Sequence, residues 1–363
     1  TDSGAGVLGF VDIADPAAPA PDGLVGIGGE PTSVAVRDSY ALAGVNTSTT
    51  VECPTDDDIV SITEWSGELA IVDIAGRTVV RTIDLGGQPD SVAVSPDGRY
   101  AAVAIENERI EAIDDGLLPQ GSVIDASDPC EPTASGDPRP GELVIVDLLG
   151  AVDDWSTRTV DLTGIAEVAP SDPEPEFVDI NENNFAVVTL QENNHIVEVN
   201  LKNGKVIRDF SAGSAALDRL DLTEEELGPQ ENGLISFTEG PIEKRREPDA
   251  VAYVGTNRMA TANEGDYEDA NGDEGGSRGF TVFNRGGKVK FEAGMSFEYA
   301  SASAGHYNEG RSENKGGEPE AVEYGSYDDG EFLFVGSERA NVVGVYDVAD
   351  PNSPKLLQLL PTG

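Results

Sequence analysis

The sequence predicts an all-β protein, a β-propeller of four-stranded antiparallel blades. Three observations support this fold: a phrase that recurs five times, short strands in sets of four, and the absence of a sustained helical period. The phrase opens with Glu or Gln, continues with Pro and ends in Val. Its five copies lie at residues 30–34, 88–92, 174–178, 247–251 and 318–322, with prolines 58, 86, 73 and 71 residues apart.

Each copy starts a set of short strands, rich in Val, Ile and aromatic residues and bounded by Gly, Pro, Asn or Asp. After the second copy we expect strands at 92–94, 100–105, 143–147 and 157–162. After the third we expect them at 177–180, 186–190, 196–201 and 206–210, and after the fifth at 333–335, 342–348 and 356–360. One helix is expected, at 214–227, between two blades.

Five full blades fit this pattern, beginning near residues 30, 88, 174, 247 and 318. Residues 7–13 and 24–27 are expected to be the last two strands of another blade. A propeller protects its strand edges by closing on itself. We therefore expect a single propeller domain over 1–363, cut from a longer polypeptide with six or seven blades and lacking its closing segment at one or both ends.

The long insertions all fall in two of the four kinds of connection. They join the second strand to the third (46–67, 106–141, 263–277) or the fourth strand to the next blade (212–246, 294–317). In an antiparallel blade these two connections lie at the same end, opposite the tight turns. Because long loops on a rigid scaffold are commonly functional, we expect the functional face there.

The net charge of −45, from 68 acidic and 23 basic residues, argues against nucleic acid or anionic lipid as a partner, since both require basic patches. It favours divalent cations, with a solvated surface in a saline medium as the alternative. No apolar run is long enough to span a membrane, and no signal peptide is visible at Thr1, which suggests a trimmed N-terminus.

The two cysteines, Cys53 and Cys130, fall in the long insertions of consecutive blades. A disulfide between these loops, formed outside the cell, is the favoured interpretation. A pair of free thiols is the alternative.

Acidic residues recur at two places in each blade, just before or within the first strand and just after the second. Because many like charges at one channel mouth repel one another, they require cations, protons or arginines, and oxygen-rich sites suit Ca²⁺. The alternative is that these acids only cap strand ends. The first group is Glu30, Asp90, Glu174, Glu176, Glu247, Asp249, Glu318 and Glu320; the second is Glu106, Glu108, Glu192, Glu264, Asp266 and Glu338. Arg109, Arg246 and Arg339 lie in the same phrases as possible counterions.

A second candidate calcium site is the acidic loop after the second strand of the fourth blade. Asp269, Asn271 and Asp273 alternate oxygen donors as calcium loops do, although the loop matches an EF-hand only loosely. A solvated acidic loop is the alternative. The run 56–58 is interpreted as solvated surface.

Catalytic candidates are few. His306 is followed by Arg311 and Lys315, the best local supply of groups for an anion such as phosphate, and Arg246 is a further candidate. In a phosphoesterase, calcium and these cations would hold the phosphate while a carboxylate-bound water attacked. Structural roles for His306 and for the second histidine, His195, are the alternative.

Several phrases resemble the choice-of-anchor I family of secreted bacterial propellers, which are related to mesenchyme-specific cell-surface glycoproteins. They are residues 89–98, 189–194, 246–249, 262–266 and 311–320, and the likeness covers essentially the whole chain. The resemblance implies an extracellular or surface-anchored propeller, of a group often labelled phytase-like or alkaline-phosphatase-like. The N-terminal half-blade, the C-terminal closing segment and an anchor expected of that family are not found in this sequence.

Two functions are therefore expected. The first is a secreted or surface-associated module, at the cell surface or in the periplasm, that binds Ca²⁺ and contacts matrix, a surface polymer or another protein. The second is a calcium-dependent phosphoesterase. The scarcity of Lys and Arg on the elaborated face weakens the enzyme hypothesis.

Overall fold

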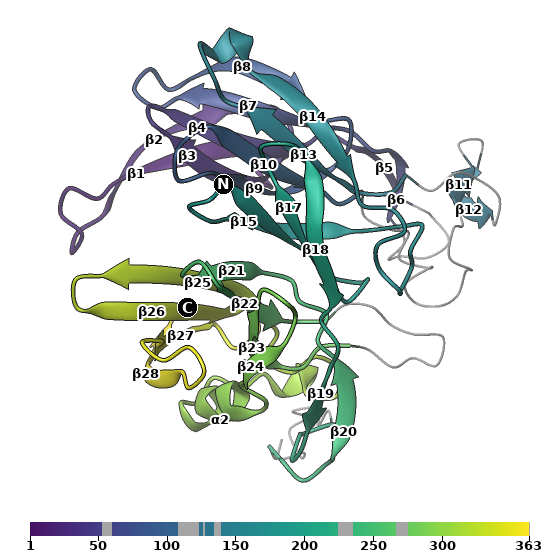
Figure 1. Cartoon of the computed structure of the whole chain (residues 1–363), viewed down its shortest axis with the longest axis vertical. Helices are drawn as coiled ribbons and strands as arrows, with labels where there is room; N and C mark the ends of the chain where they lie inside the picture. Colours follow the sequence, from purple (N-terminus) through teal and green to yellow (C-terminus); the bar gives the residue numbers. More distant parts are fainter. Residues whose placement is uncertain are drawn as a thin grey trace. The chain divides into compact units, whose positions relative to one another are not determined.

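The computed structural model describes residues 1–52, 60–107, 123–125, 128–133, 139–223, 235–265 and 275–362. Within these residues, strands form five four-stranded sheets, and in each sheet the strands lie in chain order (Figure 1). Such antiparallel sheets, each built from one stretch of chain, are the blades of a β-propeller, so the predicted fold class is confirmed. The chain divides into two compact units, which we describe separately.

The first unit comprises Thr1–Gly164, Pro170–Ala186 and Asn200–Lys205. It opens with a two-stranded sheet of β1 (Val7–Asp12) and β2 (Ala20–Gly26). Blade 1 contains β3 (Glu30–Arg37), β4 (Tyr40–Asn46), β7 (Gly67–Asp73) and β8 (Thr78–Asp84). Blade 2 contains β9 (Pro89–Val94), β10 (Tyr100–Ile105), β13 (Glu142–Asp147) and β14 (Ser156–Asp161), with the short helix η1 (Val152–Asp154) before β14.

Each of these blades carries a hairpin between its second and third strands. The hairpins are β5 (Thr49–Glu52) with β6 (Val60–Glu64), and β11 (Val123–Asp125) with β12 (Asp128–Thr133). The predicted disulfide falls at this point: Cys53 lies outside the described residues, and Cys130 lies in β12 where side chains are not described.

Blade 3 consists of β15 (Pro175–Ile180), β16 (Phe185–Leu190), β17 (His195–Asn200) and β18 (Lys205–Ser211). β15 is assigned to the first unit, and most of the other three strands to the second.

The second unit continues with the hairpin β19 (Ser214–Leu217) and β20 (Ile242–Arg245). Blade 4 contains β21 (Val251–Val254), β22 (Arg258–Asn263), β23 (Gly279–Asn284) and β24 (Val289–Glu292). Helix α2 (Ser296–Ser303) and the short helix η2 (Glu309–Arg311) lie in the connection to blade 5. Blade 5 contains β25 (Pro319–Tyr327), β26 (Gly330–Ser337), β27 (Val342–Asp347) and β28 (Lys355–Pro361).

Burial explains why these sequences form blades. The middle strands of a blade are buried on both faces, as in β10, where five of six residues are buried, and they therefore read as nearly continuous apolar runs. The fourth strands, such as β28, are mostly exposed. Neighbouring blades pack face to face: Leu69 and Ile71 of blade 1 share one apolar cluster with Val103 and Val144 of blade 2.

The repeated phrase interlocks successive blades in the first unit. The Ser33 hydroxyl accepts a hydrogen bond from the Val92 amide at 3.0 Å, and the Ser91 hydroxyl accepts one from the Val178 amide at 3.4 Å. Gly67, the first residue of β7, lies so close to Pro89 that a Cβ atom would be 2.3 Å from the Pro89 Cδ. The phrase therefore marks the point where one blade fits against the next.

The helix predicted at 214–227 is wrong at its start, where β19 pairs with β20 in the register Ser214↔Arg245 to Leu217↔Ile242. Ala215 and Leu217 are buried while Ser214 and Ala216 are exposed, a period of two that favours a strand. The two buried side chains pack in a small apolar cluster with Leu220 and Met295. Residues 224–227 of the predicted helix lie outside the described part. Helix α2, which the described part of the structure contains, was not predicted.

In the second unit, the chain order within blade 4 sets where the insertions lie. β22 and β24 run in the same direction, so the β22–β23 loop and the segment leading to β25 lie at one end of the sheet. This agrees with the prediction for these two insertions. The first residues of blade 5 therefore lie beside the end of β22.

Candidate functional site

Three predicted carboxylates come together at the junction of blades 4 and 5. Glu264 follows β22 directly, Glu318 precedes β25, and Glu320 lies within β25. One carboxylate oxygen from each lies within 4.8 Å of those of the other two. We call these three residues the carboxylate cluster. Among the residues that the structure describes, it is the one group of three or more His, Cys, Asp or Glu with this geometry.

Glu318 is the most buried member. Its side chain is 0% exposed, and its φ of 47° is in the left-handed region, which a residue before proline rarely adopts. Arg311 Nε donates to its Oε1 at 2.7 Å and Arg339 Nε to its Oε2 at 3.0 Å. Arg339 also pairs with Glu338 at 3.0 Å. The predicted counterion role of Arg339 is therefore confirmed.

Glu264 has partners of two different kinds. Lys315 Nζ lies 3.4 Å from its Oε1, and Gln191 Nε2 donates to its Oε2 at 3.2 Å. Gln191 follows β16 as Glu264 follows β22. Gln191 was not predicted as a site residue, because only acidic residues were expected at these positions. Its position in the repeat, directly after the second strand of its blade, is the signal that identifies it.

Glu320 has the most perturbed acidity in the cluster. Burial raises the pKa of Glu320 to about 8, with further contributions from its hydrogen bond to Glu338 and from the charges of Glu264, Glu338 and Glu318. A hydrogen bond between two carboxyl groups requires a proton on one of them. Without another cation, this pair therefore retains a proton near neutral pH.

The donor set is suited to a hard cation. Calcium binds oxygen ligands at 2.3–2.6 Å, so two ligands on opposite sides of the ion lie about 5 Å apart. The oxygen separations in the cluster, all within 4.8 Å, fall inside that limit. Among the described residues, four acids, counting Glu338, meet three cationic side chains, Arg311, Arg339 and Lys315. An excess negative charge therefore remains for a proton or a metal ion.

The other predicted carboxylates of the second unit lie outside this cluster. Glu247 is 0% exposed, has a φ of 41° and pairs with Arg245 at 3.6 Å. Gly275 approaches it so closely that a Cβ atom would be 1.8 Å from a Glu247 carboxylate oxygen. Glu192 is buried, and Asp249 is half-buried with its carbonyl accepting from the Thr189 hydroxyl at 2.6 Å.

The remaining acidic candidates lie in the first unit or outside the described residues. In the first unit, Glu174 is buried, Glu176, Asp90 and Glu106 are half-buried, and Glu30 is exposed. Residues 56–58, Glu108 with Arg109, Asp266, Asp269, Asn271 and Asp273 lie outside the described part, so the acidic-loop site stays a prediction.

The cationic candidates are divided between two places. Arg311 and Lys315 reach the carboxylate cluster, whereas Arg246 is buried and donates to Glu292 Oε2 through Nε at 2.9 Å and Nη2 at 2.7 Å. His306 is half-buried, in the same loop as Arg311, and its amide donates to the Ser301 carbonyl at 2.9 Å.

The second histidine, His195, is buried at the start of β17. Its Nε2 lies 3.2 Å from the Asp209 carboxylate. Burial lowers the pKa of His195, because the cost of desolvating the imidazolium outweighs the attraction of Asp209.

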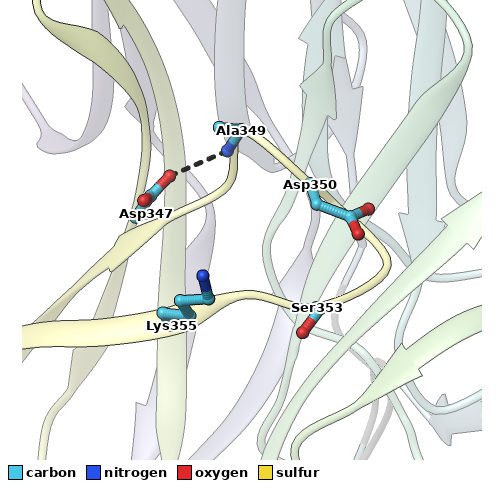
Figure 2. A pocket seen from close by; sticks show the side chains of 5 residues that line it. All are labelled: Asp347, Ala349, Asp350, Ser353 and Lys355. Carbon is cyan, nitrogen blue, oxygen red and sulfur yellow. Dashed lines mark hydrogen bonds between the residues drawn. The ribbon is translucent and has the colours of Figure 1, made fainter.

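A shallow hollow of about 310 Å³ lies at the other end of blade 5, between β27 and β28 (Figure 2). Asp347, Asp350 and Lys355 line it, together with Ala349 and Ser353. Figure 2 shows the Asp347 carboxylate accepting from the Ala349 amide, at 2.9 Å. The hollow is thus part of an ordinary polar turn, far along the strands from the cluster.

Solved structures similar to this chain include a β-propeller domain, at low sequence identity. The β-propeller domain of Cps50 (Swd1) from Myceliophteria thermophila is 7% identical, with a TM-score of 0.47, over 100% of this chain and 85% of that one. A Lactobacillus plantarum protein is 14% identical, with a TM-score of 0.45, over 98% and 77% of the two chains. No curated protein matches the sequence.

The profile of the choice-of-anchor I domain matches residues 1–275 and 273–351, together nearly the whole sequence. The family name indicates surface-anchored or secreted proteins. Among the described residues, no helix is long and apolar enough to cross a membrane. On the extent of this match, the chain belongs to the choice-of-anchor I domain family.

Proposed function

We propose that this chain is a surface-associated propeller module that binds a divalent cation, with Ca²⁺ as the expected ion, through Glu264, Glu318 and Glu320. The observation that carries the proposal is the convergence of three carboxylates, from two blades, to within 4.8 Å. Surface association follows from the family, and the cation from the charge and geometry of the cluster.

The net charge of −45 supports this function in a second way. It raises the concentration of cations near the protein and disfavours anionic partners. Carboxylate oxygens are hard ligands that suit Ca²⁺ better than the soft metals that Cys and Met select. The module would then contact a matrix component, a surface polymer or another protein through its elaborated loops.

Calorimetric titration of the chelator-treated protein with CaCl₂ at low ionic strength tests the proposal. We expect saturable binding that Glu320→Gln weakens, because the variant removes one ligand charge. Asp329→Asn is the matched control, since it removes one charge from the exposed turn between β25 and β26, at the opposite end of blade 5. Equal weakening by both variants would mean diffuse attraction rather than a site.

A calcium-dependent phosphoesterase is the second candidate, favoured by the presence of Arg311 and Lys315 beside the carboxylates. Against it, both cations already pair with glutamates, and Arg246 is held by Glu292. Hydrolysis of a generic aryl phosphate, measured with calcium and with chelator, tests this candidate. Turnover that is the same under both conditions, or absent from both, would eliminate it.

A further inference from the structure

Residues 305–317, which we call the strap, connect helix α2 to Glu318 and cross the carboxylate cluster. Two strap side chains reach it: Arg311 Nε lies 2.7 Å from Glu318 Oε1, and Lys315 Nζ lies 3.4 Å from Glu264 Oε1. The strap therefore places two of the protein's own cations on two carboxylates of the cluster.

A buried arginine fixes the backbone of the strap. Arg278, 2% exposed, donates through Nη2 to the carbonyls of Ser312 at 2.6 Å and Asn314 at 2.8 Å. Its Nη1 lies 3.3 Å from Glu298 Oε1 in α2. Removing one partner of such a buried pair is costly, so this anchor holds the strap between Arg311 and Lys315.

Gly316 allows the strap to lie on this anchor. Its φ of 69° is left-handed, and a Cβ atom there would be 2.8 Å from Glu298 Oε2 and 3.0 Å from Arg278 Nη1. Gly305, at the start of the strap, has a φ of 82° but nothing within 4 Å of its Cβ position. Both glycines have a left-handed backbone, but only Gly316 is closely packed. Gly305→Ala therefore serves as the control for Gly316→Ala, since it adds the same backbone strain without the clash.

The two ion pairs on the cluster are not equally strong. Glu318 is fully buried between Arg311 and Arg339, with nitrogen–oxygen separations of 2.7 and 3.0 Å, whereas Lys315 Nζ lies 3.4 Å from Glu264 Oε1. Because the attraction between two charges falls with their separation, the Lys315–Glu264 pair is the weaker of the two.

We propose that the strap is an ionic latch in which the Lys315 ammonium occupies the cation position on Glu264, and that a divalent cation opens the latch by displacing Lys315. This rests on the proposed function for the identity of the displacing ion. Arg278 keeps residues 312–314 in place, so the release begins at Lys315, beyond the anchored residues. The latch makes the surface at this blade junction responsive to calcium.

Calcium affinity is the first test. Lys315→Met removes the competing charge, and we expect it to tighten calcium binding by roughly tenfold. Lys288→Met removes the same charge from the exposed turn between β23 and β24 and should leave the affinity unchanged. Equal affinities of wild type and Lys315→Met would overturn the latch even if calcium binds.

Limited trypsin digestion is the second test, because Lys315 and Arg311 are themselves cleavage sites. We expect calcium to accelerate cleavage after Lys315 several-fold, normalised to a free peptide of the same sequence, while cleavage after Arg311 stays slow. Without calcium, Gly316→Ala should accelerate the same cut and Gly305→Ala should not. Mass spectrometry identifies the cuts.

The outcomes separate the two proposals. Calcium binding without faster cleavage refutes the latch and leaves the proposed function standing. Calcium binding to Lys315→Met but not to wild type supports the latch and refutes calcium binding as the function of the natural chain. Failure of both proteins to bind calcium refutes both proposals.

Discussion

Glu198 links blades 3 and 4 and offers a sharp test of how the blades are held together. The side chain, in β17, is 2% exposed and accepts from Arg285 Nε at 2.7 Å and the Tyr253 hydroxyl at 2.8 Å, while Arg208 Nη1 lies at 2.6 Å. Glu198→Gln keeps the shape of the side chain. Its amide NH₂ group, however, is a hydrogen-bond donor and would face the N–H donors of one arginine. The charge that both arginines require is also lost.

The magnitude follows from exposure. Arg208 is 46% exposed and can turn to water, so its pair contributes up to about 1 kcal/mol. Arg285 is 20% exposed and Tyr253 is buried, and hydrogen bonds to a charged group contribute about 1.5–3 kcal/mol. We expect Glu198→Gln to lower the free energy of unfolding by about 2–3 kcal/mol.

Urea denaturation measures this loss as a lower midpoint with an unchanged slope. Glu243 is an exposed acid on β20, and Glu243→Gln should change the free energy of unfolding by less than about 0.5 kcal/mol. A Glu198→Gln midpoint indistinguishable from that control would refute the claim that this carboxylate joins the two blades.

Three further results are expected. Gly67→Ala should lower the free energy of unfolding by about 1–3 kcal/mol, because the new Cβ atom would press on Pro89. Gly4 lies in open space, so Gly4→Ala should have no such effect. Equal melting temperatures of the two variants would contradict this prediction. The pKa of Glu320, raised to about 8 in the folded protein from an ordinary 4.5, means that its protonation stabilises the fold fully below pH 4.5, and that this contribution is lost as pH rises through 8. Without calcium, the melting temperature of wild type should therefore fall more between pH 5.5 and 9 than that of Glu320→Gln, and parallel curves would refute the shift. Gln191→Glu should lower the melting temperature in chelator, because it places another carboxylate beside Glu264, and calcium should restore the melting temperature. An unchanged melting temperature in chelator would show that these carboxylates do not repel one another.

Strand positions were predictable from the sequence because burial leaves a local trace. Middle strands such as β10 and β13 contain uninterrupted apolar runs, and Gly, Pro, Asn or Asp lies near the ends of each run. The helix assignment failed because an eight-residue helix such as α2, in which five residues are alanine or serine, has little apolar periodicity. Met295 and Tyr299 pack against apolar residues of the insertion at 212–246, and these contacts fix the position of α2. The spacing of residues in the sequence does not reveal such contacts.

The site was predictable only in part, for a related reason. Repeats align positions within blades, so Glu264, Glu318 and Glu320 could be named in advance. They do not reveal pairings made across insertions. Arg278 and Glu298 lie 20 residues apart in two different segments, and their buried pair depends on how those segments fold over blade 4.

The repeat also identifies the positions that supply the carboxylate cluster. Three acids meet at a junction only if the residue after one blade's second strand and the first and third residues of the next phrase are all acidic. All three are glutamates at the junction of blades 4 and 5 and also at that of blades 2 and 3 (Glu106, Glu174 and Glu176), but among the described residues only the former converge to within 4.8 Å. One junction earlier in the chain, Gln191 replaces the first acid, and its amide instead donates to Glu264 in the neighbouring blade. A single amide in the repeat thus removes a ligand from one junction and stabilises a carboxylate at the next, which makes the cluster a property of two successive blades rather than of an acidic surface.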